Sequence, residues 1–142
     1  MWGKNSVPER GEMAMSLKAV KTLFLVAALY DLILGFVFGL FFKPIYTGFA
    51  AELPNHAGYI QLAAAYIFIF GIGFLWVSRN PQANTPLISL GILMKLAFVI
   101  VVFGHLLFDT IPVFYIPFAV LDLVFLVLFI MARGALKKVA TA

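Results

Sequence analysis

The stretch SLGILMKLAFVIVVFG, residues 89–104, is apolar except for Lys95 near its middle. Together with its apolar neighbours it reaches the length of about 20 residues that a helix needs to cross a lipid bilayer. A charged side chain at the centre of such a helix costs about 2.5–3.5 kcal/mol on insertion scales. The stretch therefore predicts a membrane-spanning helix in which something balances the charge of Lys95.

The composition of the whole chain agrees with a membrane location. Of its 142 residues, 64% are hydrophobic and 11% are charged, whereas soluble domains have about 45–50% and about 25%. There are no cysteines, which excludes disulfides, iron–sulfur ligation and thiol catalysis. We predict an all-α, polytopic membrane protein with a single domain over residues 1–142.

The apolar runs predict four membrane-spanning helices. Their connections are short, so consecutive helices are expected to be antiparallel neighbours in one bundle. Residues 1–16 are polar and contain Gly and Pro, which predicts a flexible or surface-lying arm. The predicted spans are residues 20–42, 57–77, 86–108 and 112–132.

Prolines suggest where these helices begin and end. Pro44 is expected to end the first span, because it disfavours helical geometry in the residue before it. Thr85 and Pro86 are typical of the cap and first position of the third helix. The fourth span leaves two alternatives. Either a helix begins near Pro112 and is kinked at Pro117, which we favour, or Pro117 lies in the first turn of a helix that runs to about Lys137.

The basic residues predict the orientation in the membrane. Eight of them fall on one side of the predicted bundle, whereas only Lys43 falls on the other. By the positive-inside rule both termini are cytoplasmic, and we expect a multi-pass protein of the bacterial inner membrane. The eight are Lys4, Arg10, Lys18, Lys21, Arg79, Arg133, Lys137 and Lys138.

Three charged residues lie inside the predicted spans: Asp31, Lys95 and Asp122. Each is about nine to eleven residues from the cytoplasmic end of its helix, so all three lie at a similar depth. Since lipid does not tolerate isolated charges, we expect them to point inward and meet. Two carboxylates against one ammonium leave one negative charge, which needs a proton, a cation or water. Tyr66 is expected to add its hydroxyl to this network.

Glycines predict where the helices approach one another closely. Gly91 lies one turn before Lys95, on the face formed by Ile88, Val99 and Val102. Gly35 and Gly39 form a GxxxG pattern, which predicts that the first helix packs its Asp31 side against another helix.

Polar residues near the predicted outer surface are the weakest candidates for a site. Glu52, His56, His105 and Asp109 are types that bind metals, but they follow no recognised ligand spacing. We therefore predict a wetted polar rim without a metal, and the sequence identifies no cofactor. No motif or basic aromatic strip outside the spans suggests a nucleic-acid partner.

The stretch RNPQANTPLISLGILMKL, residues 79–96, joins the second and third of four short spans. This layout, with its pairing of Gly91 and Lys95, resembles the small bacterial DoxX-like membrane proteins. The resemblance implies a small membrane subunit, sometimes attached to quinone-linked redox systems.

Two functions follow from the sequence. The first is a structural or accessory subunit that contacts lipids and forms a homo-oligomer or joins a larger membrane complex, with the charged residues locking the bundle. The alternative is proton-coupled transport or a quinone-linked redox site built on Asp31, Lys95 and Asp122.

Overall fold

The computed structural model of the protein describes residues 15–140, and most of the predicted N-terminal arm lies outside them. The described chain forms α1 (Leu17–Gly48), α2 (Ala57–Arg79), α3 (Thr85–Phe108) and α4 (Tyr115–Ala140), with no strand among these residues. Each helix contains a segment long and apolar enough to cross a membrane. The predicted all-α class with four membrane-spanning helices is confirmed.

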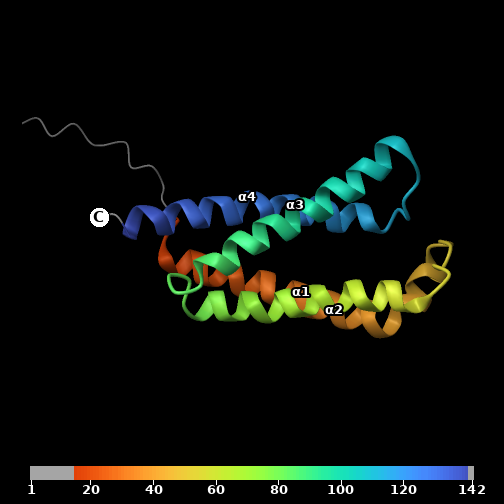
Figure 1. The fold of residues 1–142 in the computed structure, drawn as a ribbon, viewed down its shortest axis with the longest axis horizontal. Helices are drawn as coiled ribbons and strands as arrows, with labels where there is room; N and C mark the ends of the chain where they lie inside the picture. Colours follow the sequence, from red (N-terminus) through yellow and green to blue (C-terminus); the bar gives the residue numbers. More distant parts are fainter. Residues whose placement is uncertain (1–14, 141–142) are drawn as a thin grey trace, which may run out of the picture.

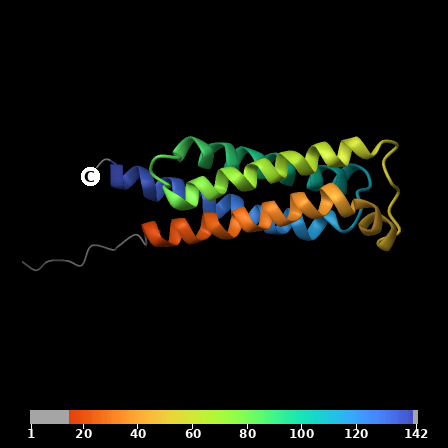
Figure 2. The ribbon, with the colours of Figure 1, turned by 90° about the horizontal axis from the view of Figure 1, so that it is seen from below.

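The helices form two antiparallel hairpins, α1 with α2 and α3 with α4 (Figure 1). The start of α1 and the end of α4 lie at the same end of the bundle (Figure 2). We call this the terminal end, and the opposite end, with residues 49–56 and 109–114, the loop end. From the turn after α2, α3 diverges from α2 toward the loop end (Figure 1).

At two glycines, the backbones of α1 and α2 approach each other closely. A Cβ atom on Gly35 would lie 2.7 Å from the carbonyl oxygen of Ala64 and 2.8 Å from the amide nitrogen of Phe68. A Cβ on Gly71 would lie 2.9 Å from the amide nitrogen of Leu32. The two backbones therefore touch where a methyl group has no room, and the prediction that Gly35 faces another helix is confirmed. Gly39 is less tightly packed.

The terminal end of the bundle is closed by a packed core. The ring of Phe24 stacks on that of Phe129 with centroids 4.4 Å apart, and the ring of Phe74 meets Phe129 edge-on at 5.1 Å. A Cβ on Gly91 would lie 2.6 Å from the Phe74 ring. The aromatic side chains fill the space between the helices here, and Gly91 makes room for them.

A second core lies toward the loop end, where Phe38, Phe42 and Ile60 pack with Phe114. Within it the hydroxyls of Tyr46 and Tyr115 share a hydrogen bond of 2.7 Å. Each phenol needs a polar partner when it is withdrawn from water, and here each supplies the other's. The bond joins the end of α1 to the start of α4.

The prediction that the first span ends before Pro44 is correct in part: helical geometry breaks at Phe41, one residue before the predicted end, but a helical segment then resumes through Pro44. The helix continues to Gly48, and its geometry departs from helical at Phe41, with φ −117° and ψ 20°. Pro44 has no N–H for the carbonyl of the residue four positions earlier and its ring crowds that carbonyl, so the helix is kinked one turn upstream and then resumes.

The favoured alternative for the fourth span is wrong. The helix begins at Tyr115, so Pro117 lies in its first turn, where the missing N–H would have no helical partner anyway. Before it, residues 112–116 form tight turns, with Tyr115 N–H donating to the Pro112 carbonyl at 3.0 Å. Asp122 is therefore only about 10 Å from the start of α4. At α3, Asn84 rather than Thr85 occupies the cap position.

Candidate functional site

Asp31 of α1, Lys95 of α3 and Asp122 of α4 meet in the interior of the bundle. The Lys95 Nζ atom donates a hydrogen bond of 2.7 Å to Asp31 Oδ1 and lies 2.9 Å from Asp122 Oδ1. The exposed fractions are 1% for Lys95, 0% for Asp31 and 5% for Asp122. We call these three residues the charged cluster.

The helical repeat explains why these side chains point inward. On α3 the buried positions are Ile88, Gly91, Lys95, Val99 and Val102, which is the face predicted for Lys95. They recur every three or four residues, so they form one stripe along the helix. Asp31 lies between the buried positions 28 and 35 of α1, and Asp122 between buried positions 119 and 126 of α4. Each charge occupies one place in an otherwise apolar stripe.

The charged cluster does not satisfy all its own polar atoms. Asp31 Oδ2 is buried and has no hydrogen-bond partner among the described residues. Asp122 Oδ1 is held by an ion pair with Lys95 Nζ at 2.9 Å, longer than the contact of Lys95 with Asp31. When all three groups are ionised, two carboxylates and one ammonium give a net charge of −1. One unpaired acceptor oxygen and one excess negative charge are thus held away from water.

Aromatic rings that were not predicted from the sequence flank the ammonium group. Lys95 Nζ lies 5.1 Å from the centroid of the Tyr30 ring and 5.6 Å from that of Phe125. Such contacts attract a cation to the face of the ring. For Phe125 the spacing was an available signal, because it lies three residues after Asp122 on the same helix. Tyr30 directly precedes Asp31, a spacing that does not place two side chains on one face, so no signal in the sequence pointed to it.

Tyr66 does not join the charged cluster as predicted. Its side chain is 58% exposed, and it has no hydrogen-bond partner among residues 15–140. It nevertheless lines a cavity that also touches Asp31, Lys95 and Asp122. Tyr30 is the phenol beside the ammonium instead, and its buried hydroxyl has no partner within the described chain.

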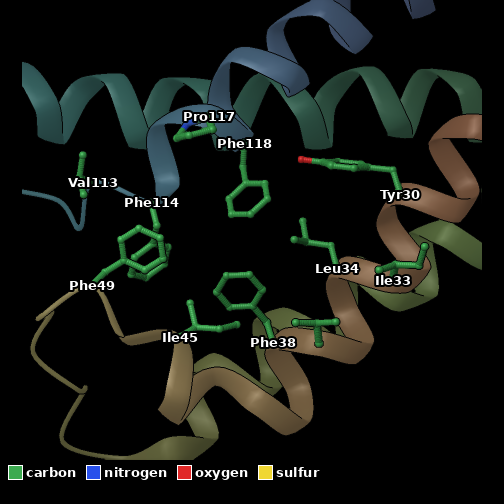
Figure 3. Close-up of a pocket in the computed structure, with 11 residues that line it drawn as sticks. Tyr30, Ile33, Leu34, Phe38, Ile45, Phe49, Val113, Phe114, Pro117 and Phe118 are labelled. Atoms are coloured by element: carbon green, nitrogen blue, oxygen red, sulfur yellow. The ribbon is translucent and has the colours of Figure 1, made fainter. Parts of the chain in front are cut away.

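Two cavities lie on the loop-end side of the charged cluster, and the second of them is lined by its residues. The first, of about 620 Å³, lies between α1 and the start of α4, and its lining is apolar apart from the hydroxyl of Tyr30 (Figure 3). The second, of about 360 Å³, has the charged cluster as its polar part. Phe38 and Phe118 line both cavities, and their rings meet edge-on with centroids 5.9 Å apart.

The second cavity, which we call the α2–α3 cavity, opens at the side of the bundle. Ala63 and Tyr66 of α2 and Ala97 and Val101 of α3 line it, and all four are exposed on the surface of the bundle. The divergence of α3 from α2 leaves this gap (Figure 1). On the other side of the cluster, the rings of Phe24, Phe74 and Phe129 fill the interior. The cluster is therefore approached from the loop end and the side.

The polar residues near the loop end do not assemble into a metal site. His105 Nδ1 and Asp109 Oδ2 are 3.7 Å apart and both side chains are largely exposed. His56 instead caps α2, its Nδ1 accepting a hydrogen bond of 3.0 Å from Gly58 N–H. Within residues 15–140, no three His, Cys, Asp or Glu side chains, Glu52 included, come together as metal ligands.

In comparisons with protein families, curated proteins and solved structures, nothing matches the chain. The fold and the site therefore define its class by themselves. It is a multi-pass membrane protein, a helical bundle with a buried Asp–Lys–Asp cluster at the wall of a side-opening cavity.

Proposed function

We propose that the protein is a proton-coupled carrier of small molecules that enter from the membrane, with the charged cluster as its working site. The observation that carries this proposal is the unbalanced charge of Asp31, Lys95 and Asp122 at the wall of the α2–α3 cavity. A single balanced ion pair would be enough to lock the helices together, whereas this cluster has one carboxylate more than its ammonium can balance. Ionisable groups within membranes often belong to proton relays and substrate pockets.

The excess negative charge assigns a proton to one of the two aspartates when no ligand is bound. Asp122 is the better carrier of this proton, because its contact with Lys95 is the longer one, 2.9 Å against 2.7 Å, and its side chain is 5% exposed whereas that of Asp31 is 0% exposed. Once Asp122 is neutral, Asp31 and Lys95 remain a balanced pair. Proton exchange at Asp122 then leaves the bond between α1 and α3 intact.

Transport also needs access from the opposite side, which the packed rings of Phe24, Phe74 and Phe129 close. We propose that the carrier alternates between two states. In one the α2–α3 cavity is open, and in the other the terminal-end core opens while α3 closes on α2. Four helices enclose a small volume, so we expect a homodimer to form the complete pathway.

The proposed location is the cytoplasmic membrane of a bacterium, with the terminal end inside. Lys18, Lys21, Arg79 and Arg133 belong to the terminal end, whereas Lys43 is near the loop end. The positive-inside rule supports this orientation. The α2–α3 cavity would then be accessible from the outer half of the bilayer.

Infrared spectroscopy of the protein in lipid nanodiscs tests the proton site. As the pH is raised, we expect the carbonyl band of a protonated, buried carboxylic acid to disappear, because Asp122 gives up its proton. This difference band should be missing from the spectra of the Asp122→Asn variant.

Asp109→Asn is the matched control, since it removes an exposed carboxylate at the end of α3. It should leave the buried band unchanged. If neither Asp122→Asn nor Asp31→Asn alters any pH-dependent band, no aspartate of the cluster exchanges a proton, and the proposed function is refuted.

An accessory role in a larger complex is the second candidate. It is favoured by the exposed apolar side chains at the loop end, where Leu107 is 76% and Phe108 is 90% exposed. Gly35 does not provide the contact that a partner would use, because α2 already covers it. The resemblance to DoxX-like proteins, with its implied link to quinone-linked redox systems, stays a prediction.

Purification in a mild detergent checks the accessory role. A partner protein should copurify in a fixed ratio with the natural chain and be lost when Leu107 and Phe108 are both replaced by alanine. Identical recovery of that partner with the Leu107→Ala/Phe108→Ala variant would contradict the use of this patch.

A further inference from the structure

We propose that the α2–α3 cavity binds a protonated amine carried on a small apolar body, in exchange for the proton of Asp122. This inference rests on the proposed function and names the chemical class of its ligand. It follows from three features of the site, namely its charge, its unpaired acceptor and its walls.

The charge of the site selects a cation. With Asp31, Lys95 and Asp122 all ionised, the net charge is −1, and a ligand with one positive charge makes the site neutral. An anionic ligand would face two carboxylates, and burial strengthens this repulsion because the interior screens charge poorly. A metal ion would lack ligands, because no three His, Cys, Asp or Glu side chains come together among residues 15–140.

The unpaired oxygen selects a cation that also donates hydrogen bonds. Asp31 is 0% exposed, and its Oδ2 atom is buried without a partner in the described chain, whereas Asp122 Oδ1 already lies 2.9 Å from Lys95 Nζ. Both aspartates line the cavity. An N–H group of a primary or secondary ammonium can satisfy Asp31 Oδ2, whereas a quaternary ammonium has no N–H to donate.

The walls of the cavity select the rest of the ligand. Its volume of about 360 Å³ is within the range of small-molecule sites, about 300–1,000 Å³. Phe98, Phe118 and Ile67 form its sides, and the exposed Ala63 and Ala97 stand at the lateral opening. An apolar body can therefore extend from the charged head toward the lipid, and the aromatic faces favour a cationic head.

The exchange is balanced without any covalent step. The amine enters as an ammonium ion, Asp122 releases its proton to water, and the total charge of the site stays the same. The other ionisable groups along the cavity are the phenols of Tyr66 and Tyr115, with Tyr30 beside Lys95. Binding should therefore release about one proton per ligand and strengthen as the pH rises, as linkage requires.

The test uses n-octylammonium chloride as the probe and the full-length protein in nanodiscs of zwitterionic phosphatidylcholine. Empty nanodiscs correct for partitioning into lipid. We expect saturable binding with proton release in weak buffer. Octyltrimethylammonium and neutral n-octanol should each bind about 10- to 100-fold more weakly, because hydrogen bonds to a charged group are lost.

Two variants probe the site separately. Asp122→Asn removes the excess charge but keeps the pair of Asp31 and Lys95, so it should weaken octylammonium binding by about 10- to 100-fold and abolish proton release. Ala97→Phe should reduce binding by obstructing the opening of the cavity without changing any charge. Asp109→Asn, which removes an exposed carboxylate, should bind the probe as the natural chain does.

Equal binding of n-octanol and octylammonium, or full binding by Asp122→Asn, would overturn this inference. Such a result is distinguishable from failure of the proposed function. If the infrared band still shows proton exchange at Asp122 while octylammonium does not bind, the carrier proposal stands and only the ammonium class is rejected.

Discussion

Replacing Lys95 with methionine is expected to lower the free energy of unfolding by about 3–5 kcal/mol, the usual cost of removing one partner from a buried ion pair. Methionine keeps the length of the side chain, so little packing is lost. Asp31 and Asp122, 0% and 5% exposed, would be left without their shared cation. Unfolding monitored by circular dichroism in nanodiscs or mild detergent measures the effect.

The matched control removes all three charges together. In the variant Asp31→Asn/Lys95→Met/Asp122→Asn the shapes are nearly kept, and no buried charge lacks a partner. Neutral replacement of a whole buried cluster is often neutral or stabilising, so this variant should unfold close to the natural chain. If Lys95→Met unfolds like the natural chain, the cation is not what makes the two carboxylates tolerable at this depth.

The second large effect is expected from Gly35→Ala, which should destabilise the bundle by about 1–3 kcal/mol, the usual cost of overpacking. The added methyl group would lie 2.7 Å from the carbonyl oxygen of Ala64 and 2.8 Å from the amide nitrogen of Phe68. These are backbone atoms, so no change of side-chain rotamer relieves the clash. The two helices must separate, which loosens the wall of the charged cluster at Asp31, one turn away.

Gly39→Ala provides the control on the same helix and in the same sequence pattern. Its Cβ would lie 3.8 Å from the Ala64 Cβ, an ordinary contact, so the free energy of unfolding should change by less than about 0.5 kcal/mol. Thermal unfolding of both variants gives the comparison. Alanine has a higher helix propensity than glycine, so propensity alone would stabilise both variants. Equal loss of stability in the two would therefore mean that the close contact of α1 with α2 at Gly35 is not what makes Gly35→Ala destabilising.

These predictions separate stability from function at the same site. Lys95→Met is expected to harm the fold, whereas Asp122→Asn leaves Lys95 hydrogen-bonded to Asp31 at 2.7 Å and should fold. A variant that folds but no longer exchanges a proton is the outcome that distinguishes a carrier from a helix lock.

The sequence predicted the parts of the site that depend on helix periodicity and on the cost of charge in lipid. Lys95 lies on the buried face predicted for it, and Gly35 makes the expected close contact. The depth of Asp31, Lys95 and Asp122 was enough to predict that they meet. Lipid does not tolerate isolated charges, so three charges at one depth in one bundle are expected to face its interior and pair there.

Other features were not predictable because they depend on the rotation and tilt of whole helices. Tyr66 and Tyr30 both lie at the right depth, but the packing of α1 against α2 directs Tyr66 outward and leaves Tyr30 beside Lys95. The continuation of α1 past its kink and the start of α4 at Tyr115 were missed for a related reason. Whether a helix continues past Pro44 or begins at Tyr115 depends on contacts such as the bond between Tyr46 and Tyr115.

The sequence by itself determined that this chain forms four membrane-spanning helices with three charges directed inward, because burial of apolar residues and exclusion of charge from lipid act on each helix alone. Only the tertiary structure decided that the charges border an open cavity. That cavity exists because α3 diverges from α2, and the angle between two helices is set by how their side chains fit together rather than by either sequence separately.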